Sequence, residues 1–160
     1  MYDNNKVNFV YENNNLEEVS SYKYLGIDIH HKLNWSYSIQ KRISGGWKAY
    51  FGLENNCKTT NLVMWDRNKF LFETFVTFVI LYGCEVWGCN ISRESWRNIE
   101  QIQKRFITYN LKIKRHTPYP ILLIEVGLSP IESLAMTRLP LYKHKINNMR
   151  DHRLLKLALN

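Results

Sequence analysis

The chain has 160 residues, of which 45% are hydrophobic and 14% aromatic, and this composition excludes a disordered or low-complexity polypeptide. Residues 1–100 hold 11 Lys and Arg against 11 Asp and Glu, whereas residues 101–160 hold 11 against 3, so the whole net charge of +8 lies in the second segment. Such a basic segment favours a polyanionic partner, either a nucleic acid or an anionic membrane surface. A merely solvated basic face is the alternative.

The sequence opens without a charged and apolar leader, and its most apolar run, residues 70–82, contains Glu73 and is too short to span a membrane. We therefore expect an intracellular protein, nuclear or cytoplasmic, that is not secreted. Cys57, Cys84 and Cys89 are odd in number and lack the spacing of metal ligands. They indicate a reducing compartment in which thiols serve as small core residues, with no metal and no cofactor in this chain.

Strand signals come first along the chain. Residues 6–11 alternate between apolar and polar side chains and predict a strand, and the asparagines at 13–15 predict a turn. Residues 19–29 predict one or two strands that pivot at Gly26. These strands are too few to form a sheet of their own.

A first helix begins where the hydrophobic period changes. Ser36 is suited to the N-cap position, and Gly45 and Gly46 interrupt the helix at some cost in stability. Its expected apolar face follows the helical repeat and comprises Ile39, Ile43, Trp47, Tyr50 and Phe51.

Two further helices follow. The second, at about 62–82, is apolar nearly all round in its last half, which predicts a central helix wrapped by its neighbours and closed by Gly83. The third begins after a cap at Ser92 and runs to about Asn110. Its expected buried face comprises Trp96, Ile99, Ile102 and Phe106.

The C-terminal segment begins with a basic connector, residues 112–120, that is punctuated by prolines. A short helix at about 121–125 should stop at Gly127. Pro130 should start a last helix, and Pro140 should interrupt it.

These signals predict an α+β fold that is mainly α, with a short N-terminal β-hairpin followed by a helical bundle. Three segments are expected: the hairpin at 1–35, a three-helix bundle at 36–110, and the connector with the C-terminal helices at 111–160. The last of these should end in a frayed basic tail at 150–160.

No catalytic motif is recognisable in the sequence. The sequence has no nucleophile motif, phosphate loop, zinc-hydrolase motif or pair of adjacent aspartates. Glu85, at the end of the apolar helix, is a lone acid better suited to a cap or an ion pair than to catalysis. His30 and His31 follow the hairpin and fit an exposed turn better than a metal site.

Cations on helix faces that point away from the core give the strongest functional signal. The first and third helices each carry such a face, and a glycine between two lysines of the first would let a bulky partner come close. Cations placed in this way suit phosphate contacts along a duplex, which position a protein without reading sequence. The predicted nucleic-acid contacts are Lys41, Gly45, Lys48, Arg93, Arg97, Gln101, Lys104, Arg105, Lys112, Lys114 and Arg115.

Four landmarks occur in a fixed order: YKYLGIDIHHKLNW, LYGCEVWG, IEQIQKRF and TPYPILLIEVGLSP. In this order and at these intervals the chain resembles, over about residues 7–149, the C-terminal part of the reverse transcriptase of non-LTR (LINE-type) retrotransposons. The resemblance implies that the hairpin is a palm remnant carrying the primer grip, and that the helices are the thumb and the segment after it. These helices would hold a template–primer duplex, an RNA–DNA hybrid or another primed duplex. The primer grip would comprise Lys23, Tyr24, Leu25, Gly26 and Ile27.

The chain departs from that family in what it lacks. The fingers and the palm motif with paired aspartates have no counterpart in the sequence, Asp28 does not match that motif, and the zinc knuckle of some members is missing. Mg²⁺ is therefore expected only for a complete polymerase that includes the upstream palm and fingers, and the isolated chain should be inactive. Because the palm on which they would pack is not in this sequence, Leu25 and Ile27 should be less buried than the apolar pattern of the hairpin predicts.

Two other interpretations compete with the polymerase fragment. One is a degenerate or repurposed element that serves as a nucleic-acid-binding or protein-interaction module. A membrane-surface protein is less well supported, because the basic and aromatic residues do not form one long amphipathic helix.

Overall fold

A computed structural model describes residues 9–11, 14–59 and 64–149. The chain divides into two units, Met1–Asn34 and Trp35–Asn160. The first unit holds the strands and the second holds the helices, including both segments 36–110 and 111–160. The predicted class, α+β and mainly α, is confirmed.

The strands of the first unit form two antiparallel pairs. β1 (Val10–Tyr11) pairs with β2 (Asn14–Asn15), and β3 (Ser21–Tyr24) pairs with β4 (Ile27–His30). The prediction of a turn at 13–15 is wrong for the two asparagines of β2, because backbone pairing with β1 outweighs the low strand propensity of asparagine. Phe9 of the predicted first strand is described but is not part of a strand, whereas residues 6–8 of that strand and Asn13 of the predicted turn lie outside the described residues.

The β3–β4 hairpin turns on two residues, Leu25 and Gly26. Both have positive φ angles, 46° and 80°, as in the type I′ loop whose twist matches that of the flanking strands. Glycine adopts this conformation freely, whereas a bulky leucine rarely does. Leu25 is 71% exposed, as expected, and Ile27 is half-buried. His30 is the last residue of β4 and is half-buried, so the expectation of an exposed turn fits only His31.

The second unit begins with α1 (Ser36–Thr59), in which Ser36 is the first helical residue and not the predicted N-cap; the residue ahead of the helix is Trp35, whose carbonyl accepts a hydrogen bond from the Ile39 amide at 2.9 Å. Ile39, Ile43 and Tyr50 of its predicted apolar face are buried, but Trp47 is half-buried and Phe51 is 53% exposed. The predicted face is therefore too wide, because the neighbouring helices cover a narrower stripe of α1 than the hydrophobic pattern spans.

The glycines of α1 serve helix packing. A Cβ atom on Gly46 would lie 2.5 Å from Cγ1 of Ile80, and one on Gly45 would lie 3.3 Å from Cγ1 of Val79. The expectation that Gly45 admits a nucleic acid is corrected by this placement, because the space beside the glycine is filled by a neighbouring helix.

The apolar helix consists of α2 (Trp65–Leu71), the π-helical segment η1 (Phe72–Thr77) and α3 (Phe78–Ile80). Phe72 and Val76 are buried, and the Phe72 ring stacks on Phe106, with ring centroids 4.2 Å apart. The prediction of a helix wrapped by its neighbours is nevertheless wrong, because the other helices leave part of its apolar surface uncovered. The exposed aromatic residues on this helix are Phe70, Phe75, Phe78 and, just after it, Tyr82.

Ser92 marks the start of a helix as predicted, whereas Gly83 does not directly close the apolar helix. α3 ends at Ile80 with Leu81 as its C-cap, and Gly83, with φ of 69°, is the N-cap of α4 (Cys84–Trp87), which is followed by η2 (Gly88–Asn90). Ser92 caps α5 (Arg93–Asn110), its hydroxyl accepting a hydrogen bond from the Ser95 amide at 3.1 Å. The four predicted core residues of α5 are all buried: Trp96, Ile99, Ile102 and Phe106.

The C-terminal segment adds α6 (Tyr119–Val126) and α7 (Ile131–Asn147). Gly127, with φ of 61°, ends α6 as predicted. The predicted interruption at Pro140 is wrong: α7 continues through it, because an exposed helix surface tolerates one missing backbone donor. The predicted tail at 150–160 lies outside the described residues.

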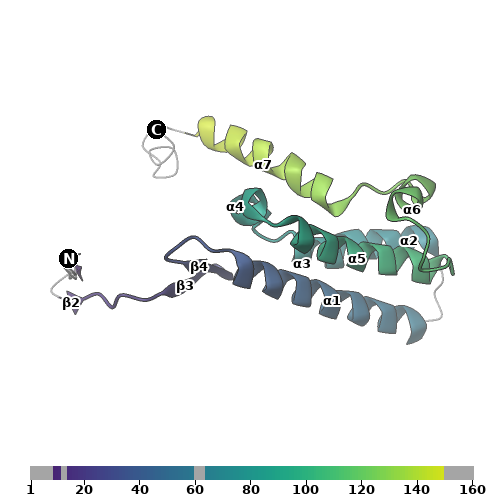
Figure 1. Ribbon diagram of the computed structural model, residues 1–160, viewed down its shortest axis with the longest axis horizontal. Helices are drawn as coiled ribbons and strands as arrows, with labels where there is room; N and C mark the ends of the chain where they lie inside the picture. Colours follow the sequence, from purple (N-terminus) through teal and green to yellow (C-terminus); the bar gives the residue numbers. More distant parts are fainter. Residues whose placement is uncertain (1–8, 12–13, 60–63, 150–160) are drawn as a thin grey trace. The chain divides into compact units, whose positions relative to one another are not determined.

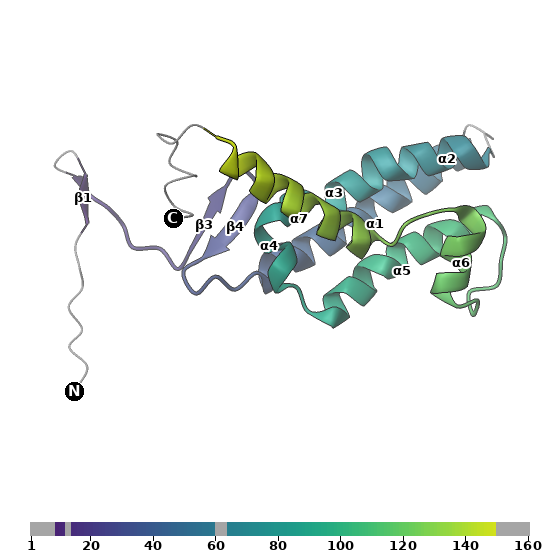
Figure 2. The same ribbon diagram turned by 90° about the horizontal axis from the view of Figure 1, so that it is seen from above.

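Helix packing joins these elements into one bundle. α1 packs on η1, α3 and α5, and α7 packs on α4 and α5, an arrangement visible in Figures 1 and 2. The side chain of Gln103, buried in α5, accepts a hydrogen bond from the Tyr119 hydroxyl and donates one to the Ser129 carbonyl, and so ties α6 and the loop after it to the bundle.

In the described part of the chain, no single helix is long and apolar enough to cross a membrane. Two strongly bent pairs meet the length and composition criteria only when combined, Trp65–Ile80 with Cys84–Asn90 and Tyr119–Val126 with Ile131–Asn147.

Candidate nucleic-acid interface

Two adjoining pockets lie between α1, α5 and the connector that follows α5. One measures about 610 Å³ and the other about 460 Å³. They share Arg105, Thr108 and Arg115 as lining residues, and the two adjoining pockets together are here called the basic groove. The larger pocket is lined by Cys57, Lys58, Asn68, Arg105, Thr108, Tyr109, Asn110, Lys112, Ile113 and Arg115. The smaller is lined by Trp47, Phe51, Gln101, Lys104, Arg105, Thr108 and Arg115.

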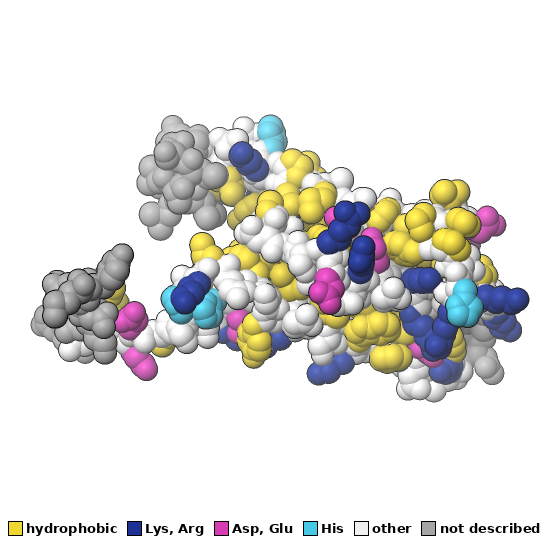
Figure 3. Space-filling view, in the orientation of Figure 1, with side chains coloured by type: hydrophobic (Ala, Val, Ile, Leu, Met, Phe, Trp, Pro, Cys, Tyr) yellow, Lys and Arg dark blue, Asp and Glu magenta, His cyan; other side chains and the backbone are white. Residues whose placement is uncertain are grey.

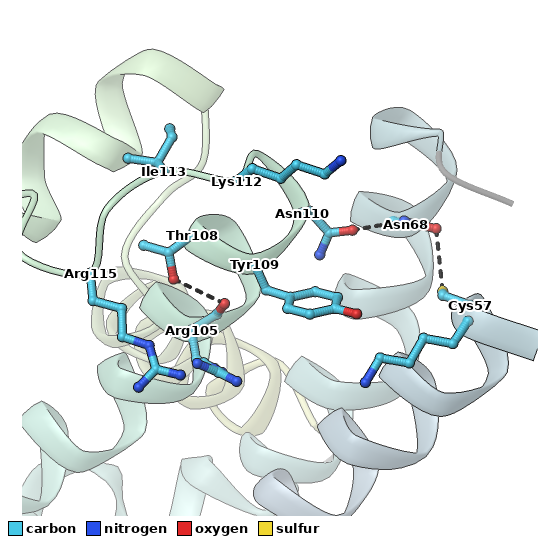
Figure 4. A pocket seen from close by; sticks show the side chains of 10 residues that line it. Cys57, Asn68, Arg105, Thr108, Tyr109, Asn110, Lys112, Ile113 and Arg115 are labelled. Carbon is cyan, nitrogen blue, oxygen red and sulfur yellow. Dashed lines mark hydrogen bonds between the residues drawn. The ribbon is translucent and has the colours of Figure 1, made fainter. Parts of the chain in front are cut away.

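Local structure at the end of α5 brings the cations of the groove together. Lys112 has a φ of 55°, which turns the chain back after the helix and returns Arg115 to the side where Arg105 lies. Thr108 donates a hydrogen bond to the Arg105 carbonyl at 3.2 Å. In Figure 4 the guanidinium groups of Arg105 and Arg115 extend toward the same side of the pocket.

Charge is the main property of the groove. Its described lining contains five cations and no Asp or Glu. In Figure 3, Lys and Arg side chains gather at the end of the helical unit that carries the α5–α6 connection. An anionic ligand would therefore meet an attractive potential throughout the groove. The cations are Lys58, Lys104, Arg105, Lys112 and Arg115.

One acidic residue stands next to the groove. The Glu54 carboxylate accepts a hydrogen bond from Lys58 Nζ at 2.7 Å, one helical turn away on α1. Burial raises the pKa of Glu54, but the Lys58 hydrogen bond and the charges of Lys58 and Arg105 lower it overall. The same hydrogen bond raises the pKa of Lys58. Glu54 thus offsets part of the charge of Lys58 at the edge of the groove.

Aromatic rings alternate with the cations. Phe51 and Trp47 stack on each other, with centroids 5.6 Å apart and planes 24° apart. At the other end of the groove, the Tyr109 ring has Lys58 Nζ at 5.4 Å and the Arg105 guanidinium at 6.0 Å from its centroid. Rings flanked by cations are the usual means by which proteins hold nucleotides without reading their sequence.

A hydrogen-bonded network supports the wall beside α2. Asn68, only 3% exposed, donates to the Asn110 side-chain oxygen at 2.8 Å and accepts from Cys57 Sγ at 3.4 Å. Asn110 in turn donates to the Phe106 carbonyl at 2.9 Å. Because these buried and half-buried polar groups satisfy one another, they hold α1, α2 and the end of α5 in fixed register.

The structure brings together only part of the predicted contact set. Gln101, Lys104, Arg105, Lys112 and Arg115 line the groove. The exposed side chains of Lys41, Lys48, Arg93, Arg97 and Lys114 line neither pocket, and Gly45 faces α3. The predicted primer grip, Lys23 to Ile27, belongs to the N-terminal unit.

Several lining residues are not apparent from the sequence. Trp47 and Phe51 follow the apolar repeat of α1, which assigns them to the core. Lys58, Asn68 and Tyr109 come together only through the pairing of helices distant in sequence. The position of Phe51 at the edge of the apolar stripe is the one signal that could have marked it as exposed.

Among the described residues, no group of three or more His, Cys, Asp or Glu side chains is placed to hold a metal ion. Cys84 is a core residue, as expected of a structural thiol, and burial raises its pKa. Cys89, in contrast, is exposed.

No family model matches the sequence, and comparisons with curated proteins and with solved structures find no significant match.

Proposed function

We propose that this chain is the C-terminal part of a LINE-type RNA-directed DNA polymerase and that its helical unit holds the template–primer in the basic groove. The observation that carries the proposal is the lining of the groove, where five cations and three aromatic rings line two adjoining pockets without an acidic residue among the described lining. The ordered landmarks from YKYLGIDIHHKLNW to TPYPILLIEVGLSP supply the family.

The tip of the β3–β4 hairpin gives further support. Leu25 keeps a positive φ and an exposed side chain, both unfavourable for leucine. Strain of this kind concentrates at functional sites. A primer-grip role for Lys23, Tyr24, Leu25, Gly26 and Ile27 explains why a leucine occupies a position suited to asparagine or glycine.

Binding of a short RNA–DNA hybrid with a recessed primer end tests the proposal. Neutralising Lys104 or Arg105 by substitution with Gln should weaken binding and lower the slope of log K against log salt by about 1 for each phosphate that the variant no longer binds. Lys143→Gln is the matched control, because Lys143 is an exposed cation of α7 that lines neither pocket. The proposal would be contradicted if the affinity for the hybrid changed neither with salt concentration nor in the Lys104→Gln and Arg105→Gln variants.

The proposed role is binding, and it does not include polymerisation by the isolated chain. The sequence lacks the paired aspartates that position two metal ions, so the isolated chain should not extend a primer when supplied with Mg²⁺ and nucleotides. Measurable incorporation by the purified chain would contradict this part of the proposal.

A protein-interaction module is the second candidate, and one observation favours it. A pocket of about 550 Å³, lined mainly by apolar residues of α1, α2, η1 and α3, opens beside the exposed Phe75. A pocket of this kind, with an exposed aromatic ring at its edge, can accept an apolar side chain of a protein partner. Binding to a protein partner through this pocket would persist at high salt and be lost in Phe75→Ser, whereas Lys104→Gln would leave it unchanged.

A further inference from the structure

The half of the basic groove next to α1 has an aromatic wall and a cationic wall. Phe51 lines it from α1, and Lys104 and Arg115 line it from α5 and the connector. We infer that this half binds an unpaired nucleotide, whose base stacks on Phe51 while its phosphates contact the cations. The inference deepens the proposed function and depends on it only in requiring that the groove binds nucleic acid.

Phe51 is an exposed aromatic side chain on a helix whose neighbouring residue is buried. Its sequence neighbour Tyr50 is 1% exposed, whereas Phe51 is 53% exposed and its ring stacks on Trp47. The stacked pair gives α1 a rigid apolar platform that faces a pocket instead of the core. A base that stacks there removes this surface from water.

The strand state of the ligand follows from the chemistry of that platform. In a duplex the faces of the bases are covered by their neighbours, so a duplex presents only groove edges and phosphates to a side chain. An unpaired base has an open π-face and stacks on aromatic rings with little dependence on its identity. A platform of aromatic rings between cations therefore suits a single strand better than a duplex.

Size and polar groups agree with this ligand. The volume of about 460 Å³ lies within the range of small-ligand pockets, about 300–1,000 Å³. The Gln101 side chain, also in the lining, carries both donors and an acceptor for a base edge. Arg105 and Arg115 extend into the second pocket, where the Tyr109 ring lies, so a strand that passes along the groove meets ring, cations and ring in turn.

Equilibrium titration with fluorescent oligo(dT), oligo(U) and a blunt DNA duplex tests the inference on the full chain. Phe51→Leu should weaken single-strand binding about tenfold and leave the blunt-duplex affinity unchanged, because stacking contributes only to the former. Phe51→Tyr should retain single-strand binding. Phe78→Leu is the matched control, because Phe78 is similarly exposed at 59% and lines neither pocket.

The two proposals fail in different ways. If Phe51→Leu leaves single-strand binding intact while Lys104→Gln weakens it, charge alone holds the strand, and the stacking inference is overturned although the proposed function stands. If the wild-type chain binds neither single strands nor duplex, both the stacking inference and the proposed function are contradicted. Weaker binding of Phe51→Leu to either oligo(dT) or oligo(U) supports the inference. Thermal unfolding of each variant confirms that the bundle is folded.

Discussion

Gly46 of α1 faces Ile80 of α3 so closely that a Cβ atom on the glycine would lie 2.5 Å from Ile80 Cγ1 and 3.0 Å from Ile102 Cδ1. These isoleucines are fully buried, so neither has room to move away. The glycine therefore sets how closely α1 approaches α3 and α5, and with it the width of the basic groove between α1 and α5.

Gly46→Ala should destabilise the bundle by about 1–3 kcal/mol, the usual cost of overpacking a filled core. Gly52 supplies the control on the same helix. A Cβ atom there meets nothing within 4 Å, so Gly52→Ala should stabilise the protein by about 0.5–1 kcal/mol through its higher helix propensity. Urea unfolding of both variants measures the difference. Equal effects of the two substitutions would show that Gly46 is not a packing constraint.

Pro140 lies inside α7 on an exposed position, where it removes one backbone donor from the helix. Pro140→Ala should restore that hydrogen bond and stabilise the protein by about 1–3 kcal/mol, less than the full cost of an interior proline because alanine also loosens the unfolded chain. The free energy of unfolding in urea measures the change, with Lys143→Ala as a control near zero. A drop in stability would show that packing of α7 on α4 and α5 needs the proline.

Leu25 occupies the first central position of the β3–β4 turn with φ of 46°. Leu25→Asn should stabilise the hairpin by about 1 kcal/mol, because asparagine tolerates this conformation and Asn-Gly is the preferred type I′ pair. Amide hydrogen exchange of β3 and β4 measures the effect, and Leu33→Asn, at a second exposed leucine with positive φ outside the strands, is the control. Unchanged exchange in β3 and β4 would contradict the strain argument. If the tip also holds a primer, Leu25→Asn should weaken binding of the primed hybrid despite the gain in stability.

Sequence signals predicted those parts of the fold that local backbone rules determine. Ser92 caps α5 and Gly127 ends α6, because each conformation depends only on the residue and its immediate neighbours. The burial of the 62–82 helix was mispredicted for the opposite reason. Its composition shows that it is apolar, but how many helices cover it depends on tertiary packing.

The candidate site was predictable only in part for a related reason. Periodicity placed Lys104 and Arg105 on exposed or half-exposed positions of α5, since charged side chains avoid the core. The same rule assigned Trp47 and Phe51 to the core, because an apolar repeat does not distinguish a packed ring from one that lines a pocket. The groove itself arises from the pairing of α1 with α5, which a single helix pattern does not contain.

Glu100 gives the bundle a dependence on pH. Burial raises the pKa of its carboxyl, the charge of Glu132 on α7 raises it further, and Arg97 on α5 lowers it in part. The folded protein therefore holds this proton more tightly than the unfolded chain. The resulting stability is complete below the ordinary pKa of 4.5 and is lost as the pH rises through the higher folded pKa.

Glu100→Gln should accordingly stabilise the protein at pH 7, where the wild-type carboxylate is charged and close to Glu132. The gain should stay below about 1 kcal/mol, because solvent screens partly exposed charges. At pH values below 4.5 it should vanish, since the protonated wild-type side chain is then neutral like glutamine. Urea unfolding at both pH values measures this. Glu94→Gln is the control and should instead destabilise at pH 7, because Glu94 lies in the first turn of α5, where a negative charge is favourable. A gain from Glu100→Gln that is the same at both pH values would show that packing, and not charge, distinguishes the two side chains.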